Sequence, residues 1–345
     1  MNESNIRRKI DYLEIALNKH LEIDENATDL EDYWFVHQAL PEVNLADIDL
    51  SISLFGKTLS APLIISPLVG GIEAATSINR NLAKAAQSLG VAMGVGSQRC
   101  AIDNPDMAST YVVRDIAPDI LLFANLGAVQ LNYGYGISEC RRALEMIGAD
   151  GLILHLNPLQ EALQTDGDTN FAGLLTKIER ICRELTVPVV VKEIGTGISE
   201  DVARKLASIG VAGIDVAGAG GTTWSEVERH RSNGDLLNNS SSVFKSWGIP
   251  LAESIKMARN GAPKMPLIAS GGIRNGIHVA KAIALGTDMA GIAAPMLRAA
   301  NISAEAVIAA LQDVIKTLRI CMFCIGASKL DELRDSYFLK RRTRD

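Results

Sequence analysis

One stretch of the sequence combines residue types that could bind a phosphate group. Residues 270–274 read Ser-Gly-Gly-Ile-Arg, and a helical pattern follows from Gly276. Glycine lets backbone N–H groups approach an anion, a helix N-terminus adds partial positive charge, and an arginine adds a fork of donors. We therefore predict a phosphate cradle here, completed by residues 291–294 (Gly-Ile-Ala-Ala), although a tight turn would also need these glycines.

Two other polar features follow apolar runs. Lys192 ends one run, where an ammonium would stabilise the electron-rich end of a cofactor ring such as an anionic reduced flavin. Residues 155–161 (His-Leu-Asn-Pro-Leu-Gln-Glu) begin at the end of another run. Taken singly, Lys192 could be a solvated strand end and His155 a core histidine, so neither carries a function alone.

Eight apolar, β-branched runs bounded by Gly and Pro would position these side chains. They cover residues 62–66, 91–95, 120–124, 151–155, 188–192, 213–217, 266–270 and 289–293. Amphipathic helical patterns lie between them, as at 79–89, 173–184 and 199–209. Continuous apolar strands are buried on both faces, as in parallel sheets. Eight such units, roughly thirty residues apart, predict an α/β fold, a (β/α)8 TIM barrel.

Seven of these strands end in polar residues that core packing does not require. The first polar side chains at or just after each end are Ser66, Ser97, Asn125, His155, Lys192, Thr222 and Ser270. Because parallel barrel strands all end at one mouth, where barrel enzymes place their chemistry, we expect these residues to converge.

Two segments interrupt the period. Residues 1–60 precede the first strand, and we predict an N-terminal helical extension that covers the barrel of 61–345, the two forming one domain. Residues 218–261 are a long loop after strand six, rich in Gly, Ser and Asn. Loops of that length usually carry function, so we expect both segments to reach the mouth.

Composition excludes several classes of protein. The chain has 34 Lys+Arg against 40 Asp+Glu, is 48% hydrophobic and only 5% aromatic, and carries a formal charge of −6. It can therefore bury a large core, but it lacks the basic, aromatic surface of a nucleic-acid binder. No apolar stretch reaches the ~18 residues of a membrane span, and the first residues lack the apolar core of a signal peptide. We predict a cytoplasmic protein with no nucleic-acid or membrane partner.

The five cysteines are odd in number and widely spread, which argues against a disulfide framework. Cys321 and Cys324 formally make a CxxC pair inside an apolar helical run at 314–327. Because a second pair of zinc ligands is missing, we expect two buried thiols there.

Several motifs of the chain resemble the type 2, FMN-dependent isopentenyl-diphosphate delta-isomerases. They are residues 8–11 (Arg-Lys-Ile-Asp), 37–42, 94–99 (Gly-Val-Gly-Ser-Gln-Arg), 155–161, 218–224 with Glu228 and Arg231, and 270–274. The resemblance implies an enzyme of isoprenoid biosynthesis that interconverts isopentenyl and dimethylallyl diphosphate by a 1,3-allylic proton shift, with reduced FMN as the acid–base. It also implies Mg²⁺, NADPH to keep the flavin reduced, and a homotetramer or homo-octamer.

The resemblance further implies a role for each of several residues. Gln160, His155 and Asn157 would be catalytic, and Glu161 would bind Mg²⁺, for which one carboxylate plus phosphate oxygens and water suffices. Arg8, Lys9, Ser97, Gln98, Arg99 and Gln160 would hold the substrate. FMN would contact Pro67, Leu68, Val69, Ser97, Asn125, Lys192, Thr222, Gly271, Gly272, Arg274, Ala293 and Ala294.

The chain departs from the family pattern at two places. Leu68 and Val69 stand where the family usually has Met-Thr, and Tyr12 stands where it usually has His. Loss of the threonine hydroxyl would remove one hydrogen bond near the flavin, worth about 0.5–1.5 kcal/mol. We expect such changes to affect the rate or the exact substrate, and not the fold.

Three alternatives stay open. An FMN barrel of the 2-hydroxy acid oxidase or dehydrogenase type needs a histidine base near the end of strand seven, where this chain has Ser270 and places His278 on the next helix. An enzyme resembling IMP dehydrogenase needs a nucleophilic cysteine in the strand-six loop, and 218–250 contains none. The third alternative is a flavin-binding homologue without isomerase turnover.

Overall fold

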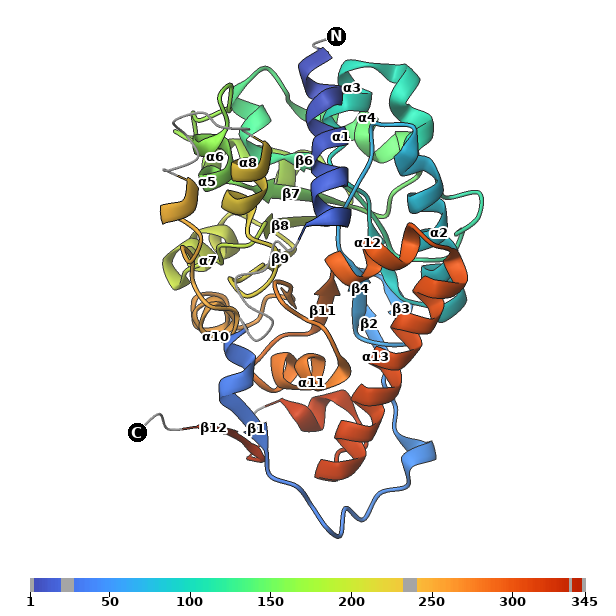
Figure 1. Cartoon of the computed structure of the whole chain (residues 1–345). Helices are drawn as coiled ribbons and strands as arrows, with labels where there is room; N and C mark the ends of the chain where they lie inside the picture. The colour runs from blue at the N-terminus through green and yellow to red at the C-terminus, as the bar shows by residue number, and fades with distance from the viewer. Residues whose placement is uncertain (1–2, 20–27, 232–240, 335–336, 343–345) are drawn as a thin grey trace.

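The computed structural model describes residues 3–19, 28–231, 241–334 and 337–342. Eight parallel strands close into a barrel in the order β10-β11-β4-β5-β6-β7-β8-β9 (Figure 1). They are β4 (Leu63–Ile65), β5 (Ala92–Gly94), β6 (Leu122–Gly127), β7 (Gly151–Leu156), β8 (Val189–Glu193), β9 (Gly213–Asp215), β10 (Leu267–Ala269) and β11 (Met289–Ile292). Each strand overlaps its predicted apolar run, so the predicted (β/α)8 TIM barrel is confirmed.

Helices surround the barrel. The three predicted from periodicity correspond to α2 (Ala74–Leu89), α6 (Leu174–Glu184) and α7 (Glu200–Ser208). The others are α1 (Glu3–Asn18), α3 (Arg99–Asp103), α4 (Ile137–Ile147), α5 (Pro158–Leu163), α8 (Trp224–Arg231), α10 (Leu251–Gly261), α11 (Gly276–Ala284), α12 (Ala294–Ala300) and α13 (Ala304–Ile325). Glycine at a left-handed φ ends α2, α4 and α13, because that conformation satisfies the last carbonyls at little steric cost. None of the helices in these described ranges is long and apolar enough to cross a membrane.

A β-hairpin closes one end of the barrel. It consists of β2 (Ile52–Leu54) and β3 (Lys57–Leu59), and its turn residues Phe55 and Gly56 have φ of 50° and 80°. The Phe55 ring packs edge-on against Phe123, near the start of β6, with 5.7 Å between centroids. Strand starts are thus covered by apolar packing, and the opposite end, where the strands finish, is the mouth.

The segment before the barrel reaches both the mouth and the far end of the chain. Helix α1 lies across the mouth, in contact with α8 and α12 (Figure 1). After residues 20–27, which lie outside the described ranges, a short 3₁₀ helix η1 (Asp29–Asp32) leads into β1 (Tyr33–Phe35), which pairs antiparallel with β12 (Leu339–Arg341). The extension is therefore helical at its start and stranded further on. Its division from 61–345 stays a prediction.

The long loop predicted at 218–261 contains helices α8 and α10, while its residues 232–240 lie outside the described ranges. Elsewhere, Cys321 and Cys324 lie on α13, partly buried and free. Burial raises the pKa of the Cys321 thiol to about 12, so it is protonated at neutral pH. In the part of the chain that the structure describes, no three His, Cys, Asp or Glu side chains form a metal-binding cluster.

Candidate functional site

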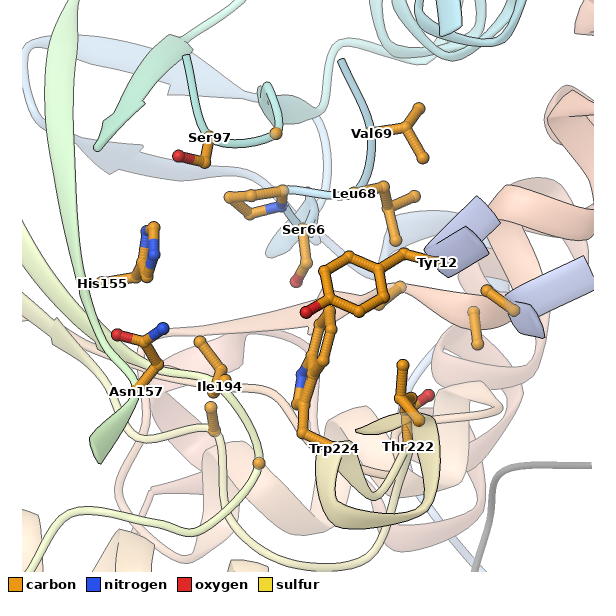
Figure 2. A pocket seen from close by; sticks show the side chains of 18 of the residues that line it. Tyr12, Ser66, Leu68, Val69, Ser97, His155, Asn157, Ile194, Thr222 and Trp224 are labelled. Carbon is orange, nitrogen blue, oxygen red and sulfur yellow. The ribbon is translucent and has the colours of Figure 1, made fainter. Parts of the chain in front are cut away.

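The mouth of the barrel holds a cavity of about 300 Å³. Each of the eight barrel strands contributes to its lining, through Ser66, Gly96, Asn125, His155, Lys192, Ala217, Ser270 and Ala293, at or just after the strand ends. Helices α1 and α8 add Tyr12 and Trp224 (Figure 2). The side chains that sequence analysis placed at the strand ends thus do share one cavity.

Every predicted site residue lines this cavity except Gln98. The Gln98 side chain is fully buried behind the wall, where its Nε2 donates to the Ala143 carbonyl at 2.9 Å and its Oε1 accepts from Asn125 N at 2.9 Å. It therefore joins β6 to α4, and the structure does not bring it to a substrate.

The phosphate cradle predicted at 270–274 has the backbone it needs. Gly271 and Gly272 have φ of 102° and 86°, which other residues rarely adopt. A Cβ on Gly271 would lie 1.9 Å from the Gly218 carbonyl oxygen, and one on Gly272 would lie 2.3 Å from that of Gly220. The loop after β10 is therefore pressed against the loop after β9. Only glycine fits at either position.

Lys192 lies at the floor of the cavity as half of a buried ion pair. Its Nζ is 2.9 Å from Asp215 Oδ2 and donates to Ser270 Oγ at 2.9 Å, while Ser270 Oγ donates to Asp215 Oδ1 at 2.7 Å. Asp215 holds the ammonium in place and compensates its charge. A cofactor ring above would meet a fixed positive charge.

The ammonium group of Lys9, on α1, donates all of its hydrogen bonds to other groups of the protein. Its Nζ donates to the carbonyls of Gly70 and Ser97 and to Tyr111 Oη, at 2.7, 2.8 and 2.8 Å, which uses all three protons. Burial, together with the nearby Arg8, lowers the pKa of Lys9 to about 8. Lys9 therefore fastens α1 to the loops after β4 and β5. A bound anion would therefore be attracted by the positive charge of Lys9 more than it would be hydrogen-bonded by its ammonium group.

His155 is neutral. Burial, and then the positive charges of Lys192 and Lys9, lower its pKa to about 4. Its Nδ1 lies 2.8 Å from Asn125 Oδ1, an acceptor, so Nδ1 carries the proton and Nε2 is left with a lone pair. His155 can position or accept a proton, but it does not supply a cation at neutral pH.

The stretch after β7 forms one hydrogen-bonded unit. Asn157 Nδ2 donates to Gln160 Oε1 at 3.1 Å and to Glu161 Oε1 at 2.8 Å, and Glu161 Oε2 accepts from Asp168 N at 2.7 Å. The Asp168 carboxylate in turn accepts from Arg99 Nη1 at 2.5 Å. Arg8 donates to Gln164 Oε1 at 2.6 Å. This stretch thus brings together two guanidinium groups and two carboxylates, of which Arg8, Arg99 and Glu161 line the cavity.

Sequence reasoning missed the partners that hold these groups, namely Asp168, Asp215, Gln164 and Tyr111. Asp215 had a signal, because it is a charged residue inside an apolar strand. Asp168, Gln164 and Tyr111 had none. His278 is 3% exposed and does not line the cavity; its Nε2 lies 2.7 Å from Glu31 Oε1 beneath the cradle. It is therefore not placed as the histidine base of a 2-hydroxy acid oxidase.

The residues present fit FMN. The glycine-only cradle beside Arg274 and the N-terminus of α11 suits a terminal phosphate, and Lys192 suits a flavin ring above the floor. Ser66 adds a buried hydroxyl whose oxygen has no protein partner. For Mg²⁺ the chain offers Glu161, which lines the cavity and is 6% exposed. A single carboxylate fits this ion only when phosphate oxygens and water complete its shell.

Solved structures of similar fold include a flavocytochrome b2 and a mandelate dehydrogenase. The structure of a flavocytochrome b2 mutant with pyruvate bound superimposes on this chain with a TM-score of 0.69 and 16% sequence identity. The match covers 95% of this chain and 82% of the flavocytochrome chain. A chimera of (S)-mandelate dehydrogenase gives 0.67 at 16% identity, covering 96% and 98%. At such identities the likeness shows the fold alone.

The sequence itself is much closer to another group. The FMN-dependent dehydrogenase family pattern matches residues 3–105 and 155–340. Isopentenyl-diphosphate delta-isomerase of Nostoc sp. is 50% identical over 335 residues, covering 97% of this chain and 95% of its own. Those of Stutzerimonas stutzeri and Rickettsia bellii are 50% and 45% identical, each covering at least 96% of both chains. The chain therefore belongs to the isopentenyl-diphosphate delta-isomerases, within the wider FMN-dependent dehydrogenase family.

Proposed function

We propose that this chain interconverts isopentenyl and dimethylallyl diphosphate by a 1,3-allylic proton shift, as a step of isoprenoid biosynthesis. The observation that carries the proposal is a single cavity whose two ends offer different binding groups. One end has the glycine cradle and Lys192, which suit a flavin mononucleotide, and the other has Arg8, Arg99 and Glu161, which suit a diphosphate with a metal ion.

FMN would be held by the cradle of Gly271, Gly272 and Arg274, by Ala293 and Ala294, and by the loop of Pro67, Leu68 and Val69. Ser97, Asn125 and Thr222 would complete its contacts, with Lys192 at its ring. When bound and reduced, with NADPH as the source of electrons, the flavin supplies the acid–base chemistry of the shift. The protein's residues then bind, orient and exclude water.

At the reacting end we assign Gln160, Asn157 and neutral His155 as the polar groups nearest the substrate carbons. Arg8, Arg99 and Ser97 would hold the diphosphate, with Lys9 adding positive charge from behind. Electrostatic complementarity explains how an acidic protein takes an anionic substrate, since local cations decide binding. We further propose a homotetramer or homo-octamer in the cytoplasm, on the family resemblance alone.

A turnover assay tests the function. We expect purified protein with FMN, Mg²⁺, NADPH and isopentenyl diphosphate, under anaerobic conditions, to form dimethylallyl diphosphate with no net consumption of NADPH. Oxidation of a 2-hydroxy acid by the same sample would favour the oxidase alternative instead. Flavin binding without either reaction would favour a homologue that has lost turnover.

The metal assignment has its own test. Glu161→Gln removes the charge but keeps the side chain's shape, so we expect loss of most turnover and of its Mg²⁺ dependence, with FMN still bound. Glu179→Gln, on the exposed face of α6, is the control and should change neither quantity. A Glu161→Gln enzyme with the wild-type Mg²⁺ response would contradict the assignment.

A further inference from the structure

Tyr12 joins the helix that crosses the mouth to a helix of the long loop. Its hydroxyl donates to Glu228 Oε1 on α8 at 2.5 Å. Its ring packs edge-on against Trp224, with centroids 5.4 Å apart and an interplanar angle of 83°. In Figure 2 the two rings lie together at the cavity wall, with the Tyr12 hydroxyl pointing toward the side on which Asn157 lies. The contact therefore closes one side of the cavity.

Glu228 is a buried carboxylate, 2% exposed, that takes donors from three helices. Tyr12 on α1 and Gln160 Nε2 on α5, at 3.2 Å, both donate to Oε1, and Arg231 Nε on α8 donates to Oε2 at 3.0 Å. A buried carboxylate is costly unless such donors satisfy it. The three donors together keep Glu228 in one position.

Glu228 and Tyr12 in turn set the orientation of the Gln160 carboxamide. Gln160 Nε2 donates to Glu228 Oε1 and to Tyr12 Oη, at 3.2 and 3.3 Å, while its Oε1 accepts from Asn157. A flipped amide would turn its oxygen against the Glu228 carboxylate and its NH₂ against the Asn157 NH₂. Only one orientation satisfies every partner. Through Asn157 the same chain of bonds reaches Glu161.

We propose that Tyr12 is a positioning residue of the isomerisation, which with Glu228 fixes the Gln160 carboxamide in the cavity. This role rests on the proposed function and deepens it. The phenol suits the task because it stays a neutral donor: burial and the Glu228 carboxylate raise its pKa well above 10. The charged groups that face it are Glu228 and Arg231 from α8 and Arg8 from α1.

The decisive variant is Tyr12→Phe, which keeps the ring on Trp224 and removes only the hydroxyl. We expect kcat to fall about tenfold, equivalent to about 1.4 kcal/mol of barrier. The KM for isopentenyl diphosphate and the Kd for FMN should stay within twofold of wild type, because both ligands are held elsewhere. Tyr135→Phe is the matched control: its hydroxyl donates to Asp103 Oδ1 at 2.6 Å, outside the cavity lining, and kcat should not change.

A second variant separates positioning from simple packing. Tyr12→His places a titrating donor beside Glu228, so we expect its kcat to change with pH between about 5 and 8 relative to wild type, whereas Tyr12→Phe follows the wild-type profile at a lower rate. An unchanged kcat in Tyr12→Phe, or a loss shared equally by Tyr135→Phe, overturns the role while leaving the proposed function standing. If the wild-type chain shows no turnover, the proposed function is wrong, and so is the positioning role of Tyr12.

Discussion

The two ends of the cavity are held in different ways. At the cradle end, backbone meets backbone: the loops after β9 and β10 touch at Gly218 and Gly271 and at Gly220 and Gly272, with no space for a Cβ. At the opposite end, long side chains from α1, α3, α5 and α8 satisfy one another, as Arg99 does with Asp168 and Tyr12 with Glu228. The first arrangement is set by the barrel, and the second by pairs of side chains.

This difference predicts where each end can change. A cradle made from backbone tolerates no substitution at its glycines, so an altered residue should cost cofactor binding. An end made from side-chain pairs can be adjusted one residue at a time, so an altered residue should cost rate or substrate affinity and leave the cofactor bound. Tyr12 and Val69, the two departures from the family pattern, are both outside the cradle.

The largest effect should come from Gly272→Ala. The new Cβ must accept a φ of 86° and meet the Gly220 carbonyl oxygen at 2.3 Å, so we expect FMN binding to weaken about 100-fold, or ~2.7 kcal/mol. Fluorescence quenching of FMN on titration measures the Kd. Gly134→Ala, with a φ of 92° and nothing within 4 Å, pays a similar backbone cost without the clash and should bind FMN normally. A wild-type Kd for FMN in Gly272→Ala would contradict the assignment of residues 270–274 as the phosphate cradle.

Arg99→Gln tests the other end. It removes a charge that faces the cavity and leaves Asp168 without its ion-pair partner, so we expect the KM for isopentenyl diphosphate to rise about 30-fold, or ~2 kcal/mol. The FMN Kd should not move. Arg180→Ala, which removes an exposed i,i+4 pair with Glu184, is the control for loss of positive charge. If FMN is lost together with substrate affinity, the two ends are not independent.

His155, which lines the cavity from β7, gives a pH test. In the unfolded chain its imidazole binds a proton below about pH 6.5, whereas in the folded chain it does so only below about 4. Because the unfolded state then holds the extra proton, the free energy of unfolding falls as pH drops from 6.5 to 4. Urea titrations at pH 7 and 4.5 measure the free energy of unfolding at each pH. Its decrease between these two pH values should be roughly 2 kcal/mol smaller in His155→Gln than in the wild type. An equal change with pH in both proteins would mean that folding does not lower the pKa of His155.

Val69→Thr should have the smallest effect. Val69 lines the cavity, and its carbonyl accepts from Gly96 N at 3.2 Å, so the backbone of this loop is already fixed. Adding a hydroxyl of similar shape should change kcat about fivefold, or ~1 kcal/mol, with little change in KM. An increase in kcat means that the hydroxyl was missing. A loss of both kcat and FMN affinity means that the loop is packed for valine. If neither kcat nor FMN affinity changes, residue 69 is too far from the reacting edge of the flavin to matter.

Features that depend on residues close together in the chain were predictable from the sequence. Each barrel strand is an apolar run, so the strands were found. The cradle was read from Gly271, Gly272 and Arg274; its backbone has the conformation that the prediction requires, and phosphate binding there stays a prediction. The partners of the site were not found, because Arg99 and Asp168, or Tyr12 and Glu228, are far apart in the chain and only the fold brings them together. Gln98 shows the limit most clearly: Ser97 and Arg99 on either side line the cavity, but Gln98 stands in the turn that begins α3, with φ of −84° and ψ of 6°, and its side chain is buried in the wall.

The pairing of β1 with β12 has a consequence for the order in which the chain folds. Tyr33 pairs with Arg341, and all eight barrel strands lie between them in the chain, so the strand next to η1 finds its partner only through a contact of very long sequence separation. Yet η1 supplies Asp29, which caps the start of α10, and Glu31, which holds His278 under the cradle. The support beneath the cradle therefore depends on a contact between segments very far apart in the chain, and a variant that loses the β1–β12 pairing would close its barrel without that support.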